Sequence, residues 1–97
     1  MERKERLEKL LQTIRENRHR ESSFDSLHTM LLKEIRSEEE IESDPKKNPY
    51  LDKLQQTHSV HAGGIFFAKD LKSDDRKRLY KEFIYHFELD VRNALEQ

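Results

Sequence analysis

Residues 58–67, HSVHAGGIFF, hold two of the chain's five histidines and both of its glycines. His58 and His61 are three residues apart, a spacing that places two metal ligands on one face of a helix. A zinc site needs three or four ligands, and Asp70 or His86 would complete one only through the tertiary fold. The chain has no cysteine, so no thiolate is offered to a metal. We therefore expect neither a metal nor any other cofactor.

Two other interpretations of this histidine pair stay open. The imidazoles continue an apolar seam that starts at Leu51 and Leu54 and ends at Ile65, so they can line a contact between helices. They also precede Gly63, which is a candidate for the left-handed C′ residue that ends a helix, and an imidazolium suits that negative helix end. The strand-forming side chains after the glycines leave helix, loop and strand open for residues 60–67.

Three consecutive apolar residues, Ile65, Phe66 and Phe67, follow the glycines. No single face of a helix can bury all three. They either plug the core from several sides or leave an apolar anchor exposed for a partner. We expect an irregular or short helical segment over residues 64–71.

The elements that must position these residues are helices. Of 97 residues, 40% are charged and 33% are hydrophobic, which predicts a folded chain with a thin core. Apolar spacing and capping residues predict an all-α bundle of about four helices, over residues 2–19, 23–42, 49–62 and 73–96. We expect one helical domain over residues 1–97, made of charged helices in 1–44, a loop at 45–49 and an aromatic-rich half at 50–97.

The connection between the first two helices has two interpretations. Ser22 is a candidate N-cap with Asp25 three residues later, which favours a helical hairpin packed on the C-terminal half. A seven-residue repeat also runs through the break, but it places Asn17 and Glu21 in the seam, where they fit poorly. One long helix over residues 1–44 is the alternative, and it would expose its apolar stripe to a partner.

Capping residues mark two later helix starts. Asn48 is a good N-cap, and Pro49 suits the first position of a helix because its missing N–H is not needed there. Ser73 is a candidate cap for the last helix, with Asp74 and Asp75 at the positive end of its dipole. That helix carries the widest apolar face, and seven of the eight aromatic residues follow residue 49. We therefore expect the C-terminal half to organise the core.

The function predicted from these patterns is non-enzymatic protein–protein interaction, as a small regulator, inhibitor or adaptor. No serine lies in a nucleophile-elbow sequence, and most carboxylates lie on charged faces. The predicted partner-binding residues are Leu7, Leu10, Leu11 and Ile14 on the first helix, with Ile65, Phe66 and Phe67 as a second anchor. A thin helical core also favours a homodimer.

A nucleic-acid-binding regulator is the alternative function. It would contact phosphates through Lys69, Lys72, Arg76, Lys77 and Arg78. Charge is spread in blocks: residues 1–20 hold seven basic and four acidic side chains, and residues 21–44 hold two basic and eight acidic. Such blocks favour oppositely charged surfaces that face each other, within one chain or between chains. The run Glu38, Glu39, Glu40, Glu42 and Asp44 is either a solvated helix end or a mimic of a nucleic-acid backbone.

The start of the sequence does not resemble a secretory signal. The first residues, MERKERLEKLLQ, contain no apolar stretch of the kind that a secretory signal needs. No apolar run approaches the roughly 20 residues that span a bilayer. We therefore expect a cytoplasmic protein that does not enter the membrane.

Overall fold

The computed structural model describes residues 2–20, 23–63, 65 and 73–96, and every regular element in these ranges is helical. The elements are α1 (Arg3–Glu16), α2 (Phe24–Ile41), α3 (Pro49–Gln56), the π-helical turn η2 (Thr57–Ala62) and α5 (Ser73–Glu96). The predicted all-α class is confirmed, although the first helix ends at Glu16 rather than at residue 19. Of the segment 64–71, only Ile65 is among the described residues, and it is helical.

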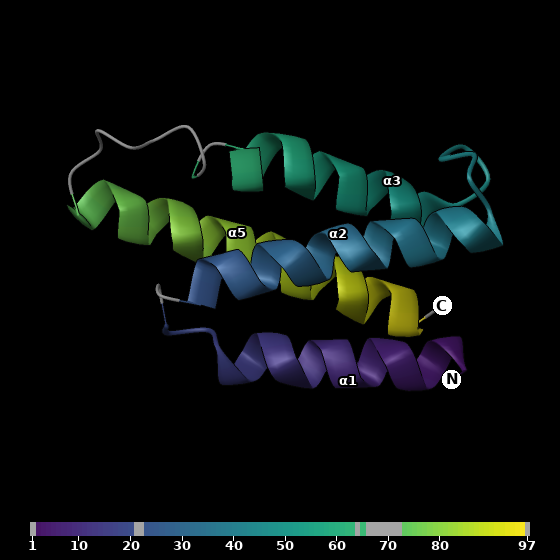
Figure 1. Ribbon diagram of the computed structural model, residues 1–97, viewed down its shortest axis with the longest axis horizontal. Coiled ribbons are helices and arrows are strands. Elements are labelled where there is room, and N and C mark those ends of the chain that lie inside the picture. The colour runs from purple at the N-terminus through teal and green to yellow at the C-terminus, as the bar shows by residue number, and fades with distance from the viewer. Residues whose placement is uncertain (1, 21–22, 64, 66–72, 97) are drawn as a thin grey trace.

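The helices run alternately up and down, and both ends of the chain lie at the same end of the molecule (Figure 1). The molecule measures 39 × 25 × 19 Å. The chain turns after α1, so the hairpin is confirmed and a single long helix over residues 1–44 is excluded. α1 packs mainly on α5, whereas α2 packs mainly on α3 and η2. The two helices of the hairpin are therefore held largely by other elements.

The core is built around one face of α5. Its buried side chains recur every three or four residues, which is the spacing of one helix face. They are Tyr80, Phe83, Ile84, Phe87, Val91 and Ala94. α1 contributes Leu7 and Ile14, and α2 contributes Leu27 and Leu31. The C-terminal helix is thus the central element of the bundle, as its wide apolar face predicts.

Asn48 begins α3 and also ties it to α2. Its side-chain oxygen accepts a hydrogen bond from the Leu51 backbone N–H at 3.2 Å, so the predicted N-cap is confirmed, with Pro49 as first helical residue. Its side-chain nitrogen donates to Glu38 Oε1 and to the Glu42 carbonyl, both at 3.3 Å. One amide therefore joins the end of α2 to the start of α3. The predicted cap at Ser22 lies outside the described residues.

The predicted left-handed conformation of Gly63 is wrong. Gly63 has φ −59° and ψ −40°, the ordinary right-handed helical conformation, and Ile65 is helical as well. A Cβ at Gly63 would lie 3.7 Å from the His58 carbonyl oxygen, an ordinary van der Waals contact. Neither backbone conformation nor packing therefore requires glycine at position 63.

Buried carboxylates of α2 hold the first turn of α1. Glu38 is completely buried, with Arg3 Nη2 at 2.9 Å from its Oε1, and it also accepts a hydrogen bond from Arg6. Arg6 Nε lies 2.8 Å from Glu34 Oε1. The acidic C-terminal half of α2 is therefore not simply solvated, because Glu34 and Glu38 turn inward and neutralise the basic start of α1.

These pairs shift the ionisation of the residues that form them. Burial alone would favour the neutral form of Glu38, but hydrogen bonds and charge from Arg3, with hydrogen bonds from Arg6 and Asn48, hold its pKa below the usual value. Tyr50 donates its hydroxyl to Glu34 Oε2 at 2.7 Å. Burial, together with this neighbouring carboxylate, raises the pKa of Tyr50 far above its usual value. Glu38 therefore acts as a charged acceptor in this network.

The other end of α1 is tied to α5. Glu88 accepts a hydrogen bond from Arg15 Nε at 3.2 Å and further hydrogen bonds from Arg18. Tyr80 donates its hydroxyl to the Asn17 carbonyl at 2.9 Å. The charge blocks of the sequence do face each other within the chain, but the second arginine pair meets α5 and not the acidic segment of α2.

Glu38→Gln tests the charge network at the start of α1. The substitution leaves the partly buried Arg6 guanidinium with less negative charge, so we expect the free energy of unfolding to fall by about 2 kcal/mol. Glu39→Gln is the matched control, because Glu39 adjoins Glu38 in the sequence but its carboxylate is exposed. Urea unfolding at neutral pH measures both, and equal changes in the two variants would contradict the role of Glu38.

Candidate functional site

The structure divides the predicted apolar stripe of α1. Leu7 is 2% exposed and Ile14 is 0% exposed, and both pack inside the chain's own core. These two residues are therefore unavailable to a partner in this fold, which corrects their assignment as partner-binding residues. Leu10 and Leu11 are only partly buried and lie at the edge of the core. Of the predicted stripe, only this edge can reach a partner.

The other predicted binding residues are only partly described. Ile65 is half-buried and packs against the core. Phe66 and Phe67 lie outside the described residues, as do Lys69 and Lys72 of the predicted nucleic-acid segment. The remaining three basic residues of that segment are exposed on the first turns of α5. They are Arg76, Lys77 and Arg78, and the last lies 3.7 Å from an Asp75 oxygen.

The histidines of η2 face two different helices. The His58 ring stacks on His28 of α2, with ring centroids 5.2 Å apart, and the His61 ring stacks on His86 of α5, with centroids 4.0 Å apart. The wide π turn rotates residues three apart further from each other than an α-turn does. The two histidines therefore line two separate helix contacts and do not form the predicted pair on one face.

The stacked arrangement does not suit a metal ion. Stacked imidazoles present their ring faces to each other, while a metal binds in the plane of the ring at a nitrogen. In the part of the chain that the structure describes, no group of three or more histidine and carboxylate side chains could hold a metal ion. The geometry fits a packing role for these rings.

Stacking also affects protonation. Burial, together with the neighbouring His58, lowers the pKa of His28, and the nearby Asp25 opposes this shift. Burial and the neighbouring His86 likewise lower the pKa of His61, against the opposing charge of Glu82. Because the folded chain disfavours the protonated forms of His28 and His61, both contacts are weakened in acid.

A hollow of about 440 Å³ lies beside the second stack, between α3, η2 and α5. Its lining includes His61, His86, Val60 and Asp90. Thr57 donates its hydroxyl to Asp90 Oδ2 at 2.5 Å, and both residues are buried. Burial raises the pKa of Asp90, although the hydrogen bond from Thr57 and the nearby His86 and Lys53 partly oppose this. The Thr57–Asp90 contact thus joins η2 to α5 below the hollow.

A second hollow, of about 380 Å³, lies between the end of α1 and α5, where the charge is mainly positive. Its lining residues are Arg18, His19, Lys81, Ile84, Tyr85, Glu88 and Arg92. Glu88 is engaged by the arginines of α1, whereas neither Lys81 nor Arg92 has an ion-pair partner among the described residues. Tyr85 is 62% exposed, so it does not belong to the aromatic core that the sequence predicts. The hollow therefore combines an exposed aromatic ring with cations that no described anion neutralises.

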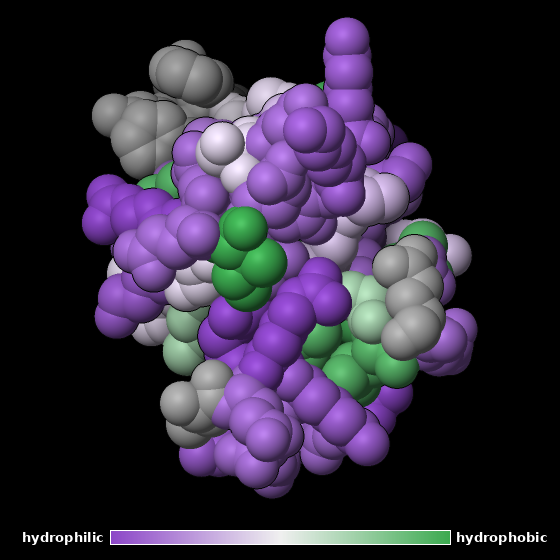
Figure 2. All heavy atoms as spheres, turned by 90° about the vertical axis from the view of Figure 1, so that its right-hand side faces the viewer, coloured by the Kyte–Doolittle hydropathy of each residue, from purple (hydrophilic) through white to green (hydrophobic). Residues whose placement is uncertain are grey.

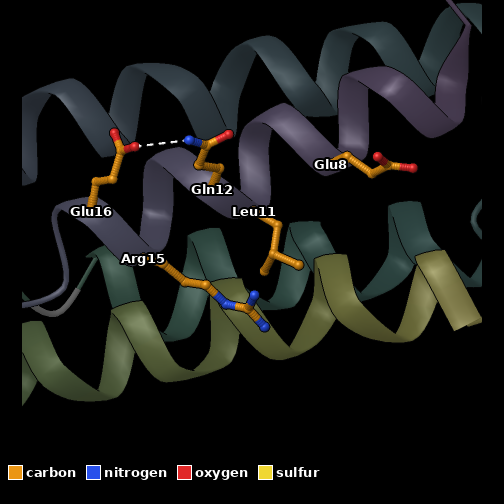
Figure 3. A pocket seen from close by; sticks show the side chains of 5 residues that line it. All are labelled: Glu8, Leu11, Gln12, Arg15 and Glu16. Carbon is orange, nitrogen blue, oxygen red and sulfur yellow. Dashed lines mark hydrogen bonds between the residues drawn. The ribbon is translucent and has the colours of Figure 1, made fainter.

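A third hollow, of about 450 Å³, continues along the outer face of α1, beside α5 (Figure 3). Leu11 and Arg15 point toward α5, while Glu8, Gln12 and Glu16 line the outward side. Gln12 donates a hydrogen bond to Glu16 at 3.1 Å. We call Leu11, Arg15, Arg18, Lys81, Tyr85 and Arg92 together the α1–α5 surface. It is the candidate functional site.

Sequence reasoning missed the α5 half of this surface. Lys81, Tyr85 and Arg92 lie four and seven residues apart, a spacing that places them on one helix face. This signal was available, but Tyr85 adjoins Ile84 at the border of the apolar face, where sequence spacing alone assigns an aromatic residue to the core.

Comparison with protein families, with curated proteins and with solved structures found no match to this chain. None of the helices in the described ranges is both long and apolar enough to cross a lipid bilayer. Function is therefore argued from the geometry of the chain itself.

The histidine stacks predict a pH dependence of stability. A histidine whose pKa is lowered by folding binds a proton more readily in the unfolded chain, so stability falls as the pH drops below about 6.5. We expect His28→Gln/His61→Gln to reduce the loss of unfolding free energy between about pH 7.5 and about pH 5.5, because the variant lacks the two imidazoles whose pKa folding lowers. Urea unfolding at both pH values measures this, with the exposed His19→Gln as control. An unchanged pH dependence in the double variant would contradict it.

Proposed function

We propose that the protein is a non-enzymatic protein-interaction module, acting as a small regulator, inhibitor or adaptor through the α1–α5 surface. One observation carries the proposal: the Tyr85 ring is 62% exposed and lies in a hollow lined by Lys81 and Arg92. Tyrosine and arginine are enriched at the centres of protein interfaces, because they bury large area and also form hydrogen bonds.

The neighbouring residues support the same proposal. Leu11 adds an apolar edge on α1, and Ile84 lines the hollow beside Tyr85. In the second hollow, Arg18, Lys81 and Arg92 outnumber the one carboxylate of Glu88, so this part of the surface has a positive field that orients an acidic partner during association. The partner is therefore expected to present apolar side chains flanked by acidic ones. A second copy of the chain, as in the predicted homodimer, meets this description as well as another protein does.

A photoreactive side chain tests the proposed surface. We expect benzoyl-phenylalanine in place of Tyr85 to cross-link a protein partner in cells, because that ring would lie inside the interface. The matched control carries the same group in place of Val60, which is 65% exposed but belongs to η2. Mass analysis after irradiation identifies the products. Equal cross-linking at the two positions, or none at position 85, would remove the proposed surface.

A Tyr85→Ser variant separates binding from folding. Because the ring is largely exposed, we expect the free energy of unfolding to change by less than about 0.5 kcal/mol. Binding of the partner identified by cross-linking to the immobilised variant should nevertheless fall by about tenfold or more, as for a central interface residue. Loss of stability that accompanies loss of binding would assign Tyr85 a structural role instead.

The exposure of Arg76, Lys77 and Arg78 favours one second candidate, binding to nucleic acid phosphates. Phosphate contacts release counterions, so binding of a labelled single-stranded oligonucleotide would weaken steeply between about 50 mM and about 200 mM salt. Replacement of all three residues by glutamine should reduce that salt dependence. Fluorescence anisotropy measures both effects, and no binding at the lower salt concentration would exclude this candidate.

A further inference from the structure

The exposed end of α2 has the composition that the α1–α5 surface is expected to bind. Ile41, the last residue of α2, is 57% exposed, and Glu39 and Glu40 beside it are exposed as well. Neither glutamate forms an ion pair with any residue that the structure describes. We call Glu39, Glu40 and Ile41 the α2 end. It is an apolar side chain surrounded by free negative charge.

The position of these charges on the helix is electrostatically unfavourable. The C-terminus of a helix is its negative end and is stabilised by cations. The last turn of α2 contains no basic residue. Figure 2 looks onto the end of the molecule that α2 reaches and shows hydrophobic spots isolated among hydrophilic side chains. A cationic surface that covered the α2 end would relieve the repulsion and bury Ile41 in one step.

The α1–α5 surface supplies those cations. Lys81 and Arg92 lack ion-pair partners in the described ranges and flank the exposed Tyr85, with Ile84 beside it. Ile41 of another copy would contact the exposed Tyr85 ring, while Glu39 and Glu40 would approach the two cations. The two surfaces are thus complementary in both charge and hydrophobicity.

We propose that the chain associates with itself head to tail, with the α2 end of one copy bound in the hollow of the α1–α5 surface of the next. This inference rests on the proposed function of that surface and names its partner. The two surfaces belong to different elements, so the contact joins unlike patches and leaves one of each free at the ends of every open complex, until a ring closes. Assembly therefore extends beyond a dimer, unlike a two-fold homodimer.

Sedimentation of the intact chain provides the first measurement. At about 50 mM salt we expect the mean mass to rise with concentration above the 11.8 kDa of one chain, and to pass twice that value. At about 500 mM salt it should return toward one chain, because free charges carry much of the contact. A single mass of one chain at every concentration would overturn the proposal, and so would a closed dimer.

Two variants that each block one surface test the pairing itself. Glu40→Gln/Ile41→Ser removes the α2 end, and Lys81→Gln/Arg92→Gln removes the cations of the hollow; all four side chains are exposed, so the fold should persist. Each variant alone should remain at the mass of one chain. Their mixture should form a 1:1 complex of twice that mass and nothing larger, because one intact α2 end then meets one intact hollow.

The outcomes separate this proposal from the function on which it rests. Lys33→Gln/Lys53→Gln removes two exposed cations that lie outside both surfaces and should assemble like the unchanged chain. A mixture that stays at the mass of one chain would overturn head-to-tail association. If photoreactive position 85 still cross-links a different protein in that case, the α1–α5 surface remains an interaction site with another occupant. If it cross-links nothing, both proposals fail.

Discussion

The position of α1 depends on carboxylates that the other helices bury beneath its arginines. Only two apolar side chains of α1 are fully buried, which is little area to fix a helix of this length. Charged pairs add what the apolar contacts lack, because Arg3 and Arg6 reach Glu38 while Arg18 reaches Glu88. A shift of α1 by one turn would break the pairs at both ends together and leave charges buried without partners, which costs several kcal/mol. The charged pairs therefore determine the position of α1 along its own axis. Its apolar residues hold it against the bundle but do not determine that position.

Much of the fold follows from local patterns in the sequence. The helices are predictable because capping residues such as Asn48 and apolar spacing act within one or two turns. The pairing of charge blocks is predictable in general but not in detail. Glu38 and Glu39 are the same residue type at adjacent positions, and only the packing of α1 decides that one is buried and the other exposed. The π turn of η2 is not predicted by the sequence patterns either, and its histidines contact two other helices.

The residues of the candidate site also show what sequence spacing cannot decide. Leu7 and Ile14 have the spacing of a binding stripe, but the same spacing also describes the inner face of an ordinary amphipathic helix. Tyr85 has the residue type of a core position, yet it lies one residue beyond the border of the buried face of α5. Residue type and period place a side chain on a face to within about one position. The proposed α1–α5 surface lies at that border, where residue type and period decide least between a buried and an exposed position.

The contacts of Asn48 limit how the loop between α2 and α3 can change in length. Its one amide caps α3 and donates to both Glu38 and the Glu42 carbonyl, so the loop after α2 must deliver it to a single place. An inserted or deleted residue in that loop would withdraw the amide from a carboxylate on which the docking of α1 also depends. Loops usually tolerate insertions because their backbone contacts are few. Here a change of loop length would weaken the docking of α1, so this loop is expected to vary in sequence much more freely than in length.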